Sequence, residues 1–162
     1  MGRGFALDET LPQRADVGRI KFQRFMPHDL PITEFGLSAA AKDSCARLVL
    51  QGAKRATTSL LAAYAYDREP LPSPGRRSVV RDGRGRDIAV IAVTRVEIRR
   101  YRDVDAAYAG LEGEKSLAHW QEAHWHYLGA ECSRIGIPLR EDVEVVLEYF
   151  ELVQPLLTLA DF

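Results

Sequence analysis

The chain has little of what marks secreted, metal-binding or membrane-spanning proteins. Its 162 residues include two cysteines, Cys45 and Cys132, which lie far apart and lack the spacing of metal ligands. Because the first residues carry no apolar leader, both thiols are expected to be free and buried, in a reducing, cytoplasmic compartment. No apolar stretch approaches the roughly 18 residues of a membrane helix, so no membrane partner is expected.

Lysine is scarce as well, with 4 lysines against 18 arginines. The net charge of −1 and the pI near 6.4 exclude a strong overall attraction to nucleic acid. The charge is nevertheless uneven, because residues 76–102 contain nine arginines and three acids, whereas residues 140–162 contain six acids and one arginine. Arginine suits bidentate phosphate contacts, but a charged run is also common on a solvated hairpin. The sequence leaves both interpretations open.

The length and the hydrophobic fraction of 46% predict one domain with a substantial core. Residues 1–29 mix glycine, proline and scattered charge, so they are expected to form an N-terminal arm or tail. The single domain then occupies residues 30–162.

Hydrophobic periodicity predicts both strands and helices. The predicted strands are 78–80, 88–98 and 143–152, the first two joined by a turn at 82–85, and the predicted helices are 103–111 and a longer one from the cap Ser116 to Gly136. Residues 60–74, with three prolines and two tyrosines, are predicted to form a loop. These elements indicate an α+β fold.

The segment at residues 52–59 carries the most chemical information. It follows a predicted helix whose apolar residues recur at helical spacing, and Gly52 lies where a left-handed residue would end that helix. Lys54 precedes Thr57 by three residues. If the chain stays helical for one more turn, Lys54 and Thr57 share a face; if it becomes a strand, they point to opposite faces.

A hydroxyl such as that of Thr57 becomes a nucleophile only when a base takes its proton, and Lys54 can be that base if it is neutral. A lysine is neutral near pH 7 only inside a pocket that excludes water. The alternative is a surface lysine after a helix, with the threonines starting a strand. Composition alone favours this alternative, so the wider pattern of the chain decides.

Several short motifs follow one another along most of the chain. They are Leu30-Pro31, Glu34-Phe35-Gly36, Gly52-x-Lys54-x-x-Thr57-Thr58-Ser59, Asp82-Gly83-x-Gly85, Ala109-x-x-Glu112-Gly113-Glu114, Ser116-Leu117-x-x-Trp120-x-x-x-His124 and Glu148-x-Phe150. Together they resemble the ASCH-domain family, a branch of the PUA-like superfamily associated with RNA, over residues 30–153. The resemblance implies a small PUA-like β-barrel flanked by helices.

The resemblance also implies an activity and a catalytic set. ASCH relatives that hydrolyse the acyl amide of N4-acetylcytidine use a lysine, a threonine and a glutamate, which match Lys54, Thr57 and Glu112 here. In that mechanism Thr57 attacks the carbonyl, neutral Lys54 is the base, and Glu112 stabilises or shuttles the proton. The loop from Glu112 to Ser116 is two residues shorter than is common in the subgroup, so Glu114 is the alternative carboxylate. The expected substrate is a small modified cytidine nucleoside, and no cofactor or metal is expected.

Further side chains are expected to contact the substrate or RNA, namely Arg55, Thr58, Ser59, Tyr64, Glu114, Ser116 and Trp120. Backbone amides near Thr57 would hold the oxyanion. Trp120 and His124 also fit core packing, while the helical spacing of His119 and His126 is too long for both to bind one metal ion.

The resemblance leaves two other functions open. Some relatives of this longer subgroup cleave single-stranded RNA, and PUA-like relatives bind RNA without catalysis, with Lys54, Arg55 and the arginines of residues 76–102 on phosphates. A non-catalytic interaction module is the third possibility. The sequence makes no prediction of the oligomeric state.

Overall fold

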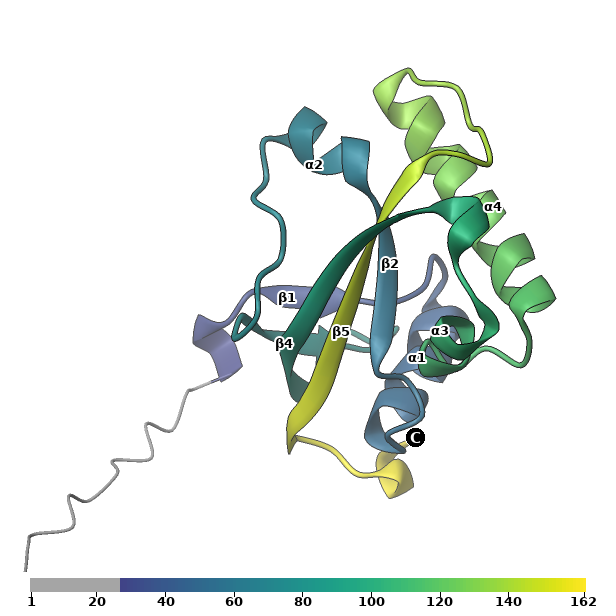
Figure 1. Ribbon diagram of the computed structural model, residues 1–162. Coiled ribbons are helices and arrows are strands. Elements are labelled where there is room, and N and C mark those ends of the chain that lie inside the picture. Colours follow the sequence, from purple (N-terminus) through teal and green to yellow (C-terminus); the bar gives the residue numbers. More distant parts are fainter. Residues whose placement is uncertain (1–26) are drawn as a thin grey trace, which may run out of the picture.

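The computed structural model describes residues 27–162. They form a five-stranded sheet and four α-helices (Figure 1), with short 3₁₀ helices at Pro27–Asp29, Tyr101–Asp103 and Leu159–Asp161. The predicted arm at residues 1–29 lies outside the described residues except for the first of these short helices. The combination of one sheet with flanking helices confirms the α+β class.

The sheet is built around two long antiparallel strands. β4 (Asp87–Arg100) pairs with β5 (Glu144–Pro155), and β3 (Arg77–Arg81) pairs antiparallel with β4. β2 (Ala56–Leu60) pairs antiparallel with β5, and β1 (Ile32–Glu34) pairs parallel with β3, so the order is β1-β3-β4-β5-β2. β3, β4 and β5 confirm the three strands predicted from the sequence.

The predicted closure of the sheet into a barrel is not observed among the described residues. β1 pairs only with β3 and β2 pairs only with β5, so both are edge strands. β1 has three residues and β2 has five, so each offers few backbone groups for a closing ladder. The sheet is therefore open.

The two longest helices begin at serine caps. α1 (Ala39–Leu50) follows Ser38, whose side chain accepts a backbone N–H of the first turn. α4 (Leu117–Ile135) follows Ser116 and ends at Gly136, which takes φ 78. Both ends of α4 confirm the prediction, because a short polar side chain caps the start and a left-handed glycine ends the last turn.

The predicted loop at residues 60–74 is wrong in its first half, which forms α2 (Leu61–Asp67). Three alanines in this segment favour a helix, and the prolines that suggested a loop begin only at Pro70. Arg68, in the left-handed region with φ 58, ends the helix. In Figure 1 the segment after α2 descends on the side of the picture opposite to α4.

Two clusters of buried side chains stabilise the fold. α4 and the short helix α3 (Ala106–Leu111), which the sequence predicted, pack Tyr108 and Trp120 against β2 and β5. The second cluster includes Phe35 and Phe150 and packs against α1. Glu112 contacts Trp120 of the first cluster and Lys54 contacts Phe35 of the second, so these two polar residues lie where the clusters meet.

Strand β2 presents its residues alternately to two faces. Ala56, Thr58 and Leu60 are buried, whereas Thr57 and Ser59 are half-buried. The chain after α1 is therefore a short loop followed by a strand, and the consecutive threonines point in opposite directions.

Both cysteines are free thiols, as predicted; Cys132 is buried as expected, whereas Cys45 is only half-buried. Burial raises the pKa of each thiol, which makes both weak nucleophiles. Within residues 27–162, no helix has the length and apolar character needed to cross a membrane.

Candidate functional site

The side chain of Glu112 lies buried at the end of α3. Glu112 caps this helix with φ −78 and ψ −4, and Gly113 then turns the chain with φ 85. A Cβ on Gly113 would also meet Cδ1 of Leu48 at 2.9 Å. The left-handed backbone conformation therefore favours glycine here, and a Cβ would in addition displace the end of the Leu48 side chain.

The loop after α1 brings Lys54 to the same place. Gly52 takes φ 74, as predicted, and the next two backbone N–H groups donate to the carbonyl of Leu48 at 2.9 and 3.0 Å. The N–H of Arg55 then donates to the carbonyl of Leu111 at 2.6 Å. This bond attaches the loop to the last turn of α3, immediately before the glutamate.

Four side chains meet the Glu112 carboxylate. Lys54 Nζ lies 3.3 Å from Oε2 and 3.3 Å from the backbone carbonyl oxygen of the same glutamate. Thr58 Oγ1 donates to Oε1 at 2.5 Å, and Trp120 Nε1 donates to the same oxygen at 2.9 Å. His124 Nε2 lies 3.3 Å from Oε2. Lys54 and Glu112 are only 5% and 4% exposed, so the pair is shielded from water.

These partners keep Glu112 ionised. Burial alone would raise the pKa of this acid, but the hydrogen bond from His124 and the positive charge of Lys54 outweigh burial, with a further contribution from Thr58. Together they lower the pKa from 4.5 to about 2. The buried carboxylate therefore depends on its partners, because an unpaired buried charge is strongly unfavourable.

A further layer holds the partners in place. His124 Nδ1 donates to the backbone carbonyl of Trp120 at 2.9 Å, and the two rings stack with centroids 4.2 Å apart. Because Nδ1 donates in this bond, Nε2 donates to Glu112 only when the imidazole carries both protons. Tyr108 Oη donates to the backbone carbonyl of Thr57 at 2.7 Å, and burial raises the pKa of this phenol.

The other side of Lys54 Nζ faces an aromatic ring. The nitrogen lies 5.0 Å from the ring centroid of Phe35, which stacks on Phe150 at 5.5 Å. This cation–π geometry places Lys54 between the carboxylate and the second cluster of buried side chains.

Thr57, the predicted nucleophile, lies apart from this network. Its hydroxyl makes no hydrogen bond to Lys54 or to any other side chain that the structure describes, because β2 turns it away from Thr58 and the carboxylate. Ser59 shares the face of Thr57, and its hydroxyl lies 2.8 Å from that of Tyr64. Of the two arrangements that the sequence left open, the strand is the one observed. The catalytic role of Thr57 stays a prediction.

The structure distinguishes the two candidate glutamates by position. Glu114 does not reach Lys54, because its carboxylate lies 2.5 Å from His119 Nδ1 on the exposed start of α4. Ser116 caps that helix by accepting the N–H of His119 at 3.1 Å. Glu112, and not Glu114, is therefore at the buried centre.

Two predicted contact residues differ sharply in exposure. Trp120 is completely buried, so it acts on a ligand only through the carboxylate it holds. Arg55 is exposed, with Nε donating to the Gly52 carbonyl at 2.8 Å. Sequence reasoning gave His124 a packing role only and missed Tyr108. The signals were present, since Tyr108 lies one turn before the glutamate on α3 and His124 lies one turn after Trp120 on α4.

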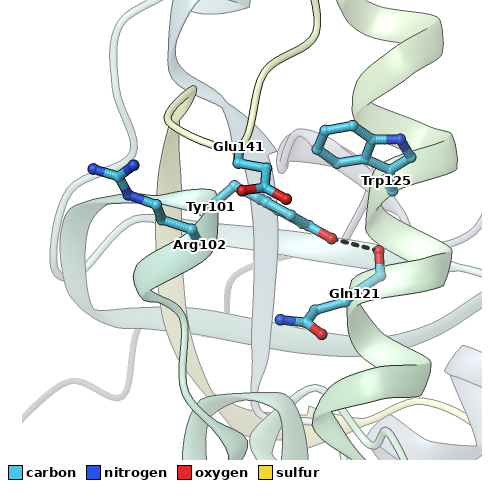
Figure 2. A pocket seen from close by; sticks show the side chains of 5 residues that line it. All are labelled: Tyr101, Arg102, Gln121, Trp125 and Glu141. Atoms are coloured by element: carbon cyan, nitrogen blue, oxygen red, sulfur yellow. Dashed lines mark hydrogen bonds between the residues drawn. The ribbon is translucent and has the colours of Figure 1, made fainter.

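A hollow of about 310 Å³ lies elsewhere on the surface, and Figure 2 shows its lining side chains, Tyr101, Arg102, Gln121, Trp125 and Glu141. The Tyr101 hydroxyl donates to the backbone carbonyl of Gln121 at 2.7 Å, so it is already engaged. None of the site residues predicted from the sequence lines this hollow. Among residues 27–162 there is no group of three His, Cys, Asp or Glu side chains that could hold a metal ion.

Comparison with known proteins identifies the family. The ASCH-domain model matches residues 32–154. The chain is similar to the solved structure of an ASCH domain from Lactobacillus crispatus JV V101, with 38% identity, a TM-score of 0.74, and coverage of 77% of this chain and 80% of that chain. It is also similar to protein EF3133 from Enterococcus faecalis V583, with 30% identity, a TM-score of 0.73 and 77% coverage of each chain. None of the curated proteins matches. The chain therefore belongs to the ASCH-domain family.

Proposed function

We propose that this chain hydrolyses the N4-acyl amide of a modified cytidine nucleoside. The observation that carries the proposal is the buried pair of Lys54 and Glu112, which are 58 positions apart in the chain and meet at 3.3 Å. Burying two ionisable groups costs desolvation energy, and such groups cluster at functional sites. Both residues match the catalytic set that the family resemblance implies.

In the proposed mechanism the Thr57 hydroxyl attacks the acyl carbon. Lys54, which pairs with the Glu112 carboxylate in the resting protein, must first give up its proton to solvent; the neutral amine then takes the hydroxyl proton, and the adjacent carboxylate stabilises the ammonium group that forms again. Catalytic hydrogen bonds of this kind commonly tighten only when the substrate binds. For this step the long side chain of Lys54, two residues before β2, would have to move from Glu112 to Thr57 when the substrate binds.

Strand β2 is also suited to stabilise the oxyanion. It pairs only with β5, so alternate backbone N–H groups on its other edge have no ladder partner among the described strands. Donors of this kind near Thr57 and Thr58 can bind the negative oxygen that develops when the acyl carbon becomes tetrahedral.

The direct test is incubation with N4-acetylcytidine and detection of released cytidine by chromatography. Lys54→Ala and Thr57→Ala should each lower turnover by about 10²- to 10⁴-fold, because each removes a group that moves a proton or forms a bond. Thr94→Ala, on the exposed part of β4, is the matched control and should leave turnover unchanged. Wild-type turnover in both site variants would rule out the assignment.

An RNA-directed role is the second candidate, supported by the arginine surplus at residues 76–102. Much of this charge is neutralised, since ion pairs with carboxylates involve Arg81, Arg86, Arg95, Arg99 and Arg102. Salt separates the two candidates. Binding of a labelled single-stranded RNA should weaken steeply as salt increases, whereas hydrolysis of a neutral nucleoside should barely change.

A further inference from the structure

The face of β2 that carries Thr57 also carries a carboxyl group to which no role has been assigned. In the register of β2 with β5, Thr57 lies directly opposite Glu148, and Ser59 lies opposite Val146. Directly opposite residues of an antiparallel pair share a face, with Cβ atoms about 4.5–5.5 Å apart. Glu148 is therefore a neighbour of the proposed nucleophile, on the face away from Glu112.

Polar groups from the adjoining elements surround Glu148. Tyr64 of α2, whose hydroxyl contacts Ser59, and Arg76, just before β3, both interact electrostatically with this carboxyl group. Val96 of β4, the partner of Glu148 on its other side, adds no charge. Glu148 is half-buried, and within residues 27–162 its carboxyl group has no hydrogen bond or ion pair in direct contact. It is thus free to pair with a ligand.

A proton on Glu148 would suit a cytosine base. Burial raises the pKa of this acid, and the positive charge of Arg76 opposes that effect without cancelling it. A protonated carboxyl group presents a donor and an acceptor side by side. The edge of an N4-acylcytosine presents the complementary pair, with N3 as acceptor and N4–H as donor.

We propose that Glu148 binds the N3 and N4–H edge of the cytidine base and donates its proton to N3 as the acyl group is transferred. The proposal rests on the amide hydrolysis proposed above and assigns to it the acid that activates the leaving group. Protonation at N3 makes the departing cytosine neutral, which is the role of a general acid.

The bonds and protons of this step balance. The bond from Thr57 Oγ1 to the acyl carbon forms, and the bond from the acyl carbon to N4 breaks. The proton of Thr57 passes to Lys54 and that of Glu148 passes to N3, so cytidine leaves as an imino tautomer that relaxes to the amino form. Water then adds to the acyl carbon and returns a proton to Glu148. Thr57 leaves with the proton held by Lys54, and the free carboxylic acid is released.

Conservative and non-conservative variants separate base binding from proton donation. Glu148→Gln keeps a donor and an acceptor but has no proton to transfer, so kcat on N4-acetylcytidine should fall about 10²-fold or more while the Kd for cytidine stays within about threefold. Glu148→Ala loses both functions, and cytidine should bind about tenfold more weakly. Glu144→Gln, an exposed carboxyl group on the same strand, is the matched control and should change neither value. Equal kcat in Glu148→Gln and wild type overturns the proton donation.

Binding is measured apart from turnover by NMR titration with cytidine and with 3-deazacytidine, in which C–H replaces N3. The wild type should prefer cytidine about tenfold, and Glu148→Ala should lose this preference. A preference retained in Glu148→Ala, or absent in the wild type, overturns the base contact even if the protein hydrolyses the amide. If the wild type shows the preference but hydrolyses nothing, the base contact is supported, while the proton donation and the proposed function fail together. If Glu148→Ala does not fold, the kcat and Kd of Glu148→Gln decide.

Discussion

Glu112 and Glu148 lie on opposite faces of the β2–β5 pair, and their surroundings shift their acidity in opposite directions. Burial raises the pKa of both. At Glu112 the effect is reversed by His124, Lys54 and Thr58, and the pKa falls to about 2. At Glu148 only Arg76 opposes burial, and the pKa stays raised. The partners, and not burial alone, therefore decide in which direction the pKa of each acid moves.

The two neighbouring threonines repeat this contrast. The Thr58 hydroxyl is committed to Glu112 at 2.5 Å, whereas the Thr57 hydroxyl faces the side of Ser59 and Glu148. In the resting protein one face of the strand pair thus holds an ionised network, and the other presents polar groups that a ligand can use. Strand β2 thus separates the Glu112 network, which supports the site, from the face of Thr57, which would contact the substrate.

Removal of Glu112 should have the largest effect on the difference between the two carboxyl groups. Glu112→Ala would leave buried Lys54 and partly buried His124 without their carboxylate, so the free energy of unfolding should fall by about 3–5 kcal/mol in urea denaturation. Glu114→Ala, which removes only the contact to exposed His119, should cost about 0–1 kcal/mol. Similar losses in the two variants would show that the Glu112 network does not stabilise the fold.

Unfolding at acid pH tests the same contrast between Glu112 and Glu148, with a somewhat smaller expected change in the free energy of unfolding. Because the pKa of folded Glu112 lies below its ordinary value of 4.5, its ionised form contributes stability that is present above that value and is lost as the pH falls toward about 2. The difference corresponds to about 3 kcal/mol. Glu112→Gln should remove this part of the pH dependence. Glu148→Gln should keep it, because a raised pKa acts with the opposite sign, its contribution being lost as the pH rises. Stability measured by urea unfolding from neutral to acid pH checks both, and an unchanged acid profile in Glu112→Gln would contradict the assignment.

The smallest expected changes in stability are those of the threonine variants. They compare the two faces of β2 directly, because the two residues are adjacent in the chain. Thr58→Val removes one of the two donors to the buried Oε1 of Glu112 and should cost about 1–3 kcal/mol of unfolding free energy. Thr57→Val, at the adjacent half-buried position, should change stability by less than about 0.5 kcal/mol. Thermal and urea unfolding of the pair suffice, and a larger loss in Thr57→Val would reverse the assignment of the two faces.

Local signals in the sequence predicted much of the fold. The Ser116 cap, the Gly136 end of α4 and the left-handed Gly52 follow from backbone chemistry within one turn of chain, and all three are observed. The first half of the 60–74 segment was mistaken for a loop, because the prolines of its second half outweighed the alanines of α2. Barrel closure was inferred from the family resemblance, and it depends on which edges pair, which no local pattern specifies.

The site was predictable in its residue types and only partly in its geometry. Lys54 and Glu112 were singled out from the sequence and lie together. The choice between Glu112 and Glu114 depended on which carboxyl group meets Lys54 and which meets His119, and the contribution of His124 depended on the meeting of α3 with α4. These are contacts between different elements, so the periodicity within one element carries no information about them.

By itself the sequence determined three of the five strands, three of the four helices and the caps of α4, because those elements follow from periodicity and capping residues in short stretches of chain, and the family resemblance named Lys54 and Glu112. Tertiary structure alone decided that Thr58 rather than Thr57 joins the buried carboxylate, and that Glu148 lies beside Thr57. The reason is physical. Strand register and the alternation of side chains determine on which face of the sheet each side chain lies. The partners of a buried ionisable group then determine the direction in which its pKa moves.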